Sequence, residues 1–217
     1  MSRLLDEIKK YQEAFKEKVP EDIQKIMLDA TEELKRLSLS KDALKVSDKA
    51  INFELPNAVN KHVSLKKALE NNEFVVINFY RGQWCPYCNL ELKALQTINE
   101  ELAKLNTKII AISPQTPDSS LSTKEKNELA FEVLSDKENK VAKEYGLVFS
   151  LAEELRPIYK SFGIDIESSN KEDSYELPMP ATYIINKNQE IIYSFIDEDY
   201  TKRSEPQTIL DIIQKNS

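Results

Sequence analysis

Two amphipathic stretches come first along the chain. Four apolar side chains recur at spacings of four, three and four residues, the period of one helical face: Leu4, Ile8, Tyr11 and Phe15. A second apolar face runs through residues 23–37, after Pro20, a residue suited to a helix start. The polar stretch 38–48 predicts a linker. We therefore expect residues 1–47 to form a helical hairpin, which either packs against the main domain or makes a dimer contact.

Strands and helices are predicted to alternate through residues 48–217. The continuous apolar run 74–80 is typical of a strand buried on both faces, and an amphipathic helix follows over 86–105. The other predicted strands cover 50–55, 108–113, 131–134, 181–185 and 191–196. The other predicted helices cover 64–70, a segment ending near 129, 137–145, 151–162 and 206–215, and a surface loop is expected over 164–176. This order predicts one α/β domain whose sheet has a parallel portion covered on both faces.

Charge and hydropathy exclude several partners. The 217-residue chain has a formal net charge of -7, so it has no general attraction for nucleic acid or anionic lipid. Lysines and glutamates are mixed along the chain, which predicts solvated helix faces. The N-terminus lacks the apolar core of a secretory signal, and the longest apolar run is far shorter than the ~20 residues of a membrane span. We expect a soluble, cytoplasmic protein.

The chain has two cysteines, Cys85 and Cys88. A disulfide between them closes a loop too small to stabilise the fold appreciably. Two thiols and one histidine, His62, are too few for a typical four-ligand zinc site. Redox chemistry therefore becomes the leading use of the pair, with no metal or organic cofactor required.

The position of the pair suits thiolate chemistry. It lies where the buried strand is expected to end and a helix to begin, and unpaired backbone N–H groups and the helix dipole favour a thiolate there. Thiols in C-x-x-C pairs at such sites have pKa values of roughly 3.5–7. We expect one sulfur to be exposed and the other to lie one turn deeper, so that one attacks a partner and the other resolves the mixed disulfide.

Four neighbours are candidate supporting residues. Arg81 either stabilises a thiolate, steers an anionic substrate, or is an ordinary surface arginine. Trp84 is expected to shield the site from water. Pro86 fits an early helical position, and Tyr87 either lines a substrate groove or caps the loop. The segment 197–200 is predicted to be a solvated loop; the alternative is that residues 200–203 close over the site.

The segment 84–88, Trp-Cys-Pro-Tyr-Cys, resembles the active site of the thioredoxin superfamily. The wider chain resembles the alkyl hydroperoxide reductase/thiol-specific antioxidant family, and within it the peroxiredoxin-like members that carry a C-x-x-C. The segments that carry this resemblance are 79–80, 111–115, 133–136, 141–142 and 145–147. The resemblance covers about residues 45–215. It implies a thioredoxin-like fold, with a mixed central sheet flanked by helices.

The resemblance offers two templates, and these assign the cysteines differently. The thioredoxin pattern makes Cys85 the attacker and Cys88 the resolver. The peroxiredoxin pattern P-x-x-x-T-x-x-C makes Cys88 the attacker, with Cys85 at the threonine position and Arg81 at the proline position. Pro180 occupies the position where peroxiredoxins use an arginine. It instead matches the cis-proline of thioredoxins, and in this chain it precedes the predicted strand that contains Thr182. A cis bond there would turn the preceding carbonyl toward the cysteine loop.

Three functions follow from these templates. The first is a peroxiredoxin-like thiol peroxidase, which forms a sulfenic acid and then a disulfide that a thioredoxin or glutathione system reduces. The second is a thiol–disulfide oxidoreductase acting on protein disulfides, motivated by the C-x-x-C and Pro180. The third is a non-enzymatic redox-sensing module that uses the helical hairpin as a partner surface. A homodimer is compatible with all three.

Overall fold

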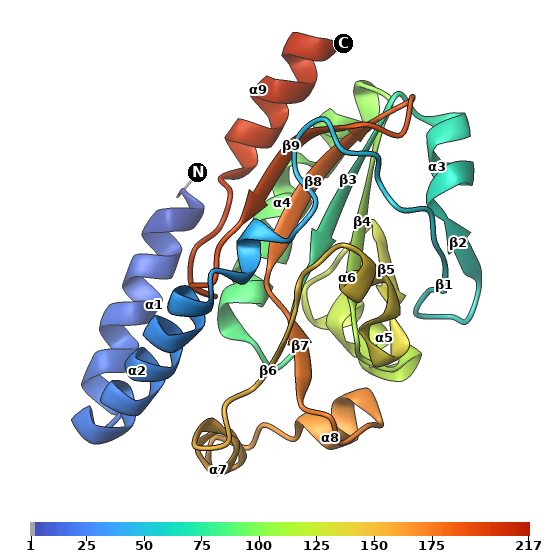
Figure 1. The fold of residues 1–217 in the computed structure, drawn as a ribbon. Coiled ribbons are helices and arrows are strands. Elements are labelled where there is room, and N and C mark those ends of the chain that lie inside the picture. Colours follow the sequence, from blue (N-terminus) through green and yellow to red (C-terminus); the bar gives the residue numbers. More distant parts are fainter. Residues whose placement is uncertain (1–2) are drawn as a thin grey trace.

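A mixed five-stranded sheet forms the centre of the computed structural model, which describes residues 3–217 (Figure 1). Its strands, in spatial order, are β5 (Glu132–Ser135), β4 (Thr107–Ser113), β3 (Phe74–Phe79), β8 (Ala181–Asn186) and β9 (Ile191–Ile196). β4 runs parallel to both β3 and β5, whereas β8 is antiparallel to β3 and β9. The predicted α/β fold with a mixed sheet is confirmed.

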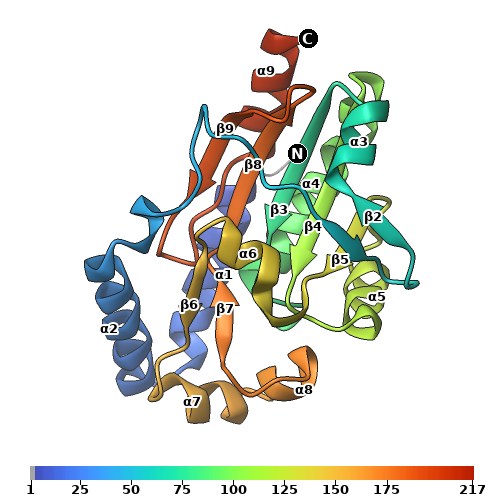
Figure 2. The same cartoon turned by 45° about the vertical axis from the view of Figure 1, so that its right-hand side comes forward.

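Helices cover both faces of this sheet (Figures 1 and 2). The face with α1, α4 and α9 buries the even-numbered residues of β3, and the face with α3 and α6 buries the odd-numbered ones, as the strand period of two requires. The helices are α1 (Leu4–Lys18), α2 (Glu21–Leu37), α3 (Leu65–Asn71), α4 (Pro86–Lys104), α5 (Pro117–Lys126), α6 (Lys140–Glu144), α7 (Leu155–Ser161), α8 (Ile166–Asn170) and α9 (Pro206–Asn216), with 3-10 turns η1 (Leu39–Lys41) and η2 (Lys137–Asn139).

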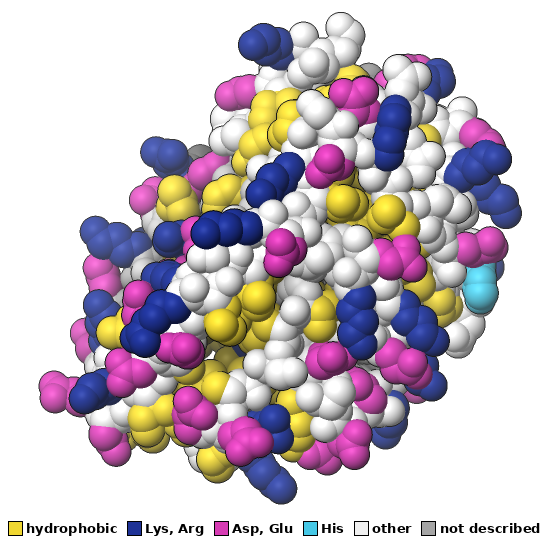
Figure 3. Space-filling view, in the orientation of Figure 1, with side chains coloured by type: hydrophobic (Ala, Val, Ile, Leu, Met, Phe, Trp, Pro, Cys, Tyr) yellow, Lys and Arg dark blue, Asp and Glu magenta, His cyan; other side chains and the backbone are white. Residues whose placement is uncertain are grey.

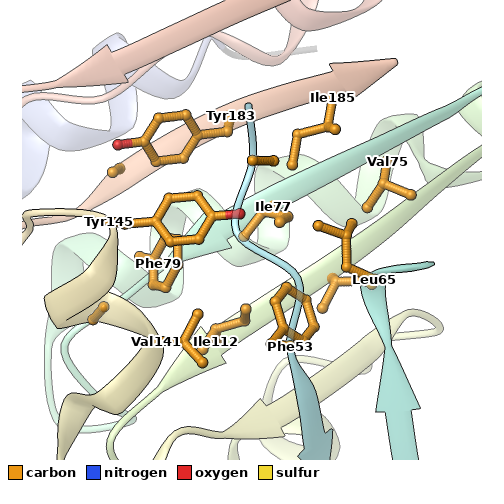
Figure 4. Packing of buried hydrophobic residues seen from close by; sticks show 14 of the residues in the cluster. Phe53, Leu65, Val75, Ile77, Phe79, Ile112, Val141, Tyr145, Tyr183 and Ile185 are labelled. Atoms are coloured by element: carbon orange, nitrogen blue, oxygen red, sulfur yellow. The ribbon is translucent and has the colours of Figure 1, made fainter. Parts of the chain in front are cut away.

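The apolar core beneath α3 and α6 holds the sheet rigid behind the cysteines. Phe79 packs against the rings of Tyr145 and Tyr183, with centroids 5.0 and 6.2 Å away (Figure 4). Ile77 lies on the same strand face, and Phe53 reaches the cluster from just before β1 (Glu54–Pro56). This packing fixes the carboxyl end of β3, where the cysteine loop begins.

Short elements account for most differences from the predicted secondary structure. The expected strand over 50–55 is reduced to β1 (Glu54–Pro56), which pairs with β2 (His62–Ser64). The expected loop 164–176 contains α8, because Asp165 caps that helix by accepting from Ser168 N at 2.8 Å. It also reaches β7 (Glu176–Pro178), which pairs with β6 (Val148–Ser150). Pairing between distant segments creates both of these small sheets, so local patterns do not reveal them.

The polar segment 38–48 is also more ordered than a linker. It contains η1, and Ala43 is buried in the core. Leu44 N donates to the carbonyl of Tyr145 at 3.1 Å. This segment therefore anchors the N-terminal helices to the rest of the fold.

The helices of the N-terminal hairpin pack on different parts of the molecule. α1 lies against α4 and buries Leu4 and Ile8. Its first backbone N–H groups, those of Leu4 and Leu5, donate to the carboxylate of Glu205 near the start of α9. α2 packs on α7 through the side chain of Met27 and its neighbours. The space left between the two helices faces the cysteine loop.

Charged side chains of both signs are interspersed over the face drawn in Figure 3, in agreement with the mixed charge pattern of the sequence. Within residues 3–217, no helix is long and apolar enough to cross a membrane.

Candidate active site

The two cysteines lie at the junction of β3 and α4. Cys85 is the N-cap residue of α4 and Pro86 its first residue. The thiol of Cys88 donates to Sγ of Cys85 across 2.7 Å, and both cysteines are free. Cys85 is 2% exposed and Cys88 is 0% exposed. The expectation of one exposed sulfur was wrong, because Cys85 belongs to a buried cluster against which Tyr11 and Tyr200 pack from distant parts of the chain.

The two thiols differ sharply in acidity. Burial opposes ionisation of Cys85, but the hydrogen bond from Cys88 and the positive charges of Arg81 and Arg203 outweigh it and lower the pKa of Cys85 to about 6. For Cys88, burial raises the pKa, and the bond to Cys85 and the charge on that sulfur raise it further. The arrangement therefore holds Cys85 as a thiolate near neutrality and keeps Cys88 protonated beside it.

Arg81 is a buried residue, 2% exposed, rather than a surface arginine. Its guanidinium carbon lies 5.0, 5.6 and 4.5 Å from the ring centroids of Trp84, Tyr159 and Tyr200. Its Nη2 donates to the hydroxyl of Tyr159 at 2.5 Å. This aromatic cage fixes one positive charge beside Cys85, so Trp84 both covers the site and holds the arginine.

Replacing Arg81 with methionine is expected to raise the pKa of Cys85 above its value of about 6. The thiolate loses a fixed positive charge, so alkylation by iodoacetamide shifts to higher pH. If the pKa rises by about one unit, the rate at pH about 6 should fall about fivefold, because the thiolate fraction drops from about one half to about one tenth. The matched control is Arg156→Met, which removes an arginine stacked 4.3 Å over Tyr175 away from the cysteines. An unchanged profile in Arg81→Met would contradict this role.

A second buried arginine, Arg203, was not among the candidate site residues chosen from the sequence, although it lies in the segment 200–203. It comes from the segment between β9 and α9, and its Nη2 lies 3.4 Å from Sγ of Cys88. Its Nε forms an ion pair with Oε2 of Glu91 across 2.6 Å. Both side chains are almost fully buried, at 1% and 2% exposure. No local pattern identifies this residue, because it is 115 positions from Cys88.

Glu91 holds Arg203 from one helical turn beyond Cys88. Burial raises the pKa of this carboxyl to about 7, although the charge of Arg203 draws it down. Thr182 donates to Oε1 of Glu91 at 3.3 Å, and Nδ2 of Asn78 donates to Thr182 Oγ1 at 3.2 Å. Thr182 thus contacts the carboxylate that orients Arg203. The three-residue spacing of Glu91 from Cys88 on one helix face is the sequence signal for this carboxylate.

Pro180 does not have the expected cis bond, since residues 3–217 contain no cis peptide. The main chain runs extended from β7 into β8, and Met179 N donates to the carbonyl of Leu147 at 2.8 Å. Paired strands on both sides hold this segment straight, so the prediction drawn from the thioredoxin pattern was wrong at this position.

The segment 197–200, predicted to be solvated, is half-buried and tied to the N-terminal hairpin. Oε1 of Glu198 accepts from Ser40 N at 2.9 Å, and Asp199 lies 3.5 Å from Nζ of Lys35. These contacts bring Tyr200 over the ring of Tyr87, with centroids 5.6 Å apart. The predicted loop is therefore part of the cover of the site.

Cys85 lines a cavity of about 420 Å³, which we call the hairpin pocket. The ring of Tyr87 forms part of its wall, in edge contact with Tyr11 at 5.2 Å. The other lining residues come from the helical hairpin, the cysteine loop with the start of α4, α7 with its following segment, and the segment after β9: Ala14, Phe15, Lys18, Val19, Met27, Arg81, Trp84, Pro86, Tyr159, Phe162, Ile164 and Tyr200. The pocket connects the reactive sulfur with solvent.

Comparison with known proteins identifies the fold of this site. The structure aligns with peroxidoxin BcpB from Mycobacterium tuberculosis at a TM-score of 0.63, covering 80% of this chain and 99% of that one, with 18% identity. A mutant PrxQ from Xylella fastidiosa aligns at 0.62, with 13% identity over 80% of this chain and 97% of that one. The chain therefore has the thioredoxin-like fold of these proteins.

Sequence comparison gives the family. The chain is 29% identical to peroxiredoxin Bcp of Escherichia coli over 104 residues, 48% of this chain and 65% of that one. It is 30% identical to peroxiredoxin Q, chloroplastic, of Oryza sativa over 146 residues, 67% of this chain and 56% of that one. Both matches span less than two thirds of the relative. A family model described as AhpC/TSA matches residues 46–194, so this chain is a member of the AhpC/TSA family.

Proposed function

We propose that this chain is a thiol peroxidase in which Cys85 attacks a hydroperoxide and Cys88 resolves the product. The observation that carries the proposal is the 2.7 Å contact between an acidified Cys85 sulfur and a protonated Cys88 sulfur. Membership of the AhpC/TSA family and the peroxiredoxin names of its relatives support peroxide as the oxidant.

The chemistry proceeds in two steps. The Cys85 thiolate attacks one oxygen of the O–O bond, which breaks to give a sulfenic acid on Cys85 and an alkoxide that takes up a proton. The Cys88 thiol then displaces the sulfenic oxygen, so that a disulfide forms and water leaves. Arg203, 3.4 Å from Cys88, favours the negative charge that develops on this sulfur as its proton departs.

The order of attack follows the electrostatics of the pair rather than the peroxiredoxin alignment. Cys85 has the lowered pKa, lies at the helix N-cap and lines the hairpin pocket. Cys88 is fully buried, and its pKa is raised. We therefore assign Cys85 as the peroxidatic residue, as in the thioredoxin template, with Cys88 as the resolving residue.

Reduction of protein disulfides is the less favoured function. A protein substrate must bring its disulfide sulfur to Cys85, which is 2% exposed. A small hydroperoxide can reach the same sulfur through the hairpin pocket. The same burial makes the third possibility, a redox-sensing module acting through protein contact, less favoured than catalysis.

The Cys85–Cys88 disulfide must be reduced to the dithiol before the next catalytic cycle, so that the enzyme can contribute to cell redox homeostasis. We propose a thioredoxin or glutathione system as the electron donor and the reducing cytoplasm as the compartment, since no other thiol in the chain can supply the electrons. Sedimentation of the reduced and oxidised forms tests separately whether the chain forms a homodimer.

A coupled assay tests the proposed function. The protein is supplied with thioredoxin, its reductase and a hydroperoxide, and NADPH oxidation is followed. In parallel, the pre-reduced protein is mixed with insulin without thioredoxin, because thioredoxin reduces insulin by itself, and the loss of protein thiols is followed. We expect peroxide-dependent turnover and slow insulin reduction. Insulin reduction without peroxide consumption would overturn the peroxidase assignment in favour of a disulfide reductase.

A further inference from the structure

The hairpin pocket is walled by a part of the chain that the family match leaves out. The match covers residues 46–194, whereas α1 and α2 end before it, at Lys18 and Leu37. These two helices contribute a third of the lining residues, among them Tyr11, Phe15 and Met27. Figure 1 shows both helices along the flank of the molecule, with α7 near their lower end.

The pocket is the route to the reactive sulfur. Cys85 lines the hairpin pocket, whereas four other well-formed cavities within residues 3–217 contain neither cysteine in their lining. Two of its walls are aromatic pairs between the hairpin and the main domain: Tyr11 against Tyr87 at 5.2 Å, and Phe15 against Phe162 at 6.3 Å. A substrate that reaches Cys85 by this route therefore enters a pocket with side chains of the hairpin in its walls.

The walls suit an apolar group larger than hydrogen peroxide. The cavity of about 420 Å³ is within the ~300–1,000 Å³ of small-molecule sites. Its lining is mostly aromatic and aliphatic and has no acidic side chain. Its two charged residues are Lys18 and the caged Arg81. A hydroperoxide with an alkyl chain can therefore bury that chain against the hairpin while its O–O group reaches the sulfur.

We propose that the N-terminal hairpin sets the substrate specificity of this site, selecting hydroperoxides that carry an unbranched alkyl chain over hydrogen peroxide. Phe15 and Met27 are the specificity-determining residues, and they act on the organic substituent rather than on the reacting oxygens. This inference rests on the proposed peroxidase function. It assigns a binding role to the helices that were expected to be a packing or dimerisation element.

The test measures kcat/KM for hydrogen peroxide and for ethyl, butyl and hexyl hydroperoxides. For wild type, kcat/KM should rise up to about fourfold for each CH2 group that enters the pocket, equivalent to about 0.8 kcal/mol. Ala14→Trp fills the pocket from α1 and should flatten this dependence on chain length. Met27→Ala widens the pocket and should raise the relative kcat/KM for cumene hydroperoxide, a branched substrate. The matched control is Leu28→Ala on the same helix, at a side chain that is 58% exposed and outside the pocket.

The outcomes separate the inference from the function on which it rests. If wild type reduces no hydroperoxide, the peroxidase function fails. If it reduces hydrogen peroxide with no gain along the alkyl series, the function stands and the specificity role of the hairpin is overturned. A gain that both Ala14→Trp and Met27→Ala leave unchanged also overturns it. Circular dichroism identifies a variant that does not fold, and the remaining variant then decides the result.

Discussion

Cys85→Ser is expected to lose peroxidase turnover by at least about a thousandfold, because a serine hydroxyl has no accessible anion at neutral pH to replace the thiolate. Cys88→Ser should retain one round of attack, since Cys85 keeps the positive charges of Arg81 and Arg203. Its reaction then stops at a sulfenic acid. The measurement is stoichiometric peroxide consumption, with the sulfenic acid trapped by dimedone and located by mass spectrometry.

The two serine variants distinguish the templates directly. If Cys88→Ser loses peroxide consumption and Cys85→Ser forms the trapped sulfenic acid on Cys88, the peroxiredoxin alignment describes the order of attack and the present assignment is wrong. The pH dependence gives a second test. The second-order rate of wild type should fall as the pH drops through about 6, because the thiolate of Cys85 is protonated there.

Arg203→Met is expected to be the most destabilising single change at the site. It leaves the Glu91 carboxylate buried without its 2.6 Å ion-pair partner, and breaking such a pair costs about 3–5 kcal/mol. The measurement is the free energy of unfolding of the reduced protein in urea. The matched control is Arg36→Met, whose partner Glu33 is 61% exposed, so its loss should cost less than about 1 kcal/mol.

The double variant Arg203→Met/Glu91→Gln tests the cause of this loss. Removing the charge of Glu91 should recover most of the stability, since the cost arises from an unpaired buried carboxylate. In the single variant, Glu91 should have a folded-state pKa raised even further above its unfolded value. Because this carboxyl already has a pKa of about 7 in wild type, the stability of the variant should fall further below that of wild type as the pH rises above about 7. A deficit that is independent of pH and remains in the double variant would indicate lost packing instead.

The strand β3 and helix α4 follow from local patterns that the sequence carries in full. The apolar run at residues 74–79 has no polar face apart from Asn78, so it fits only a doubly covered strand. The apolar positions of α4 repeat with the helical period, and Pro86 begins the helix. Since the cysteines lie between these two elements, their place at a helix start could be predicted as well.

The partners of the cysteines could be predicted only in part. Arg81 is close in sequence, but its aromatic cage includes Tyr159 and Tyr200, which the fold alone brings there. Arg203 has no neighbouring motif, and its ion pair with Glu91 joins two segments far apart in the chain. The expected cis bond before Pro180 was wrong because the pairing of β7 with β6 and of β8 with β3 decides the backbone path there.

By itself, the sequence determined that two thiols three positions apart would lie at the end of a buried strand in an α/β fold. It could do so because hydrophobic periodicity and helix-start signals are local properties of the chain. Tertiary structure decided which thiol is acidic, what covers it and how a substrate reaches it. These depend on charges and aromatic rings from α1, α7 and the segment before α9, and interactions between distant residues leave no period in the chain that would reveal them.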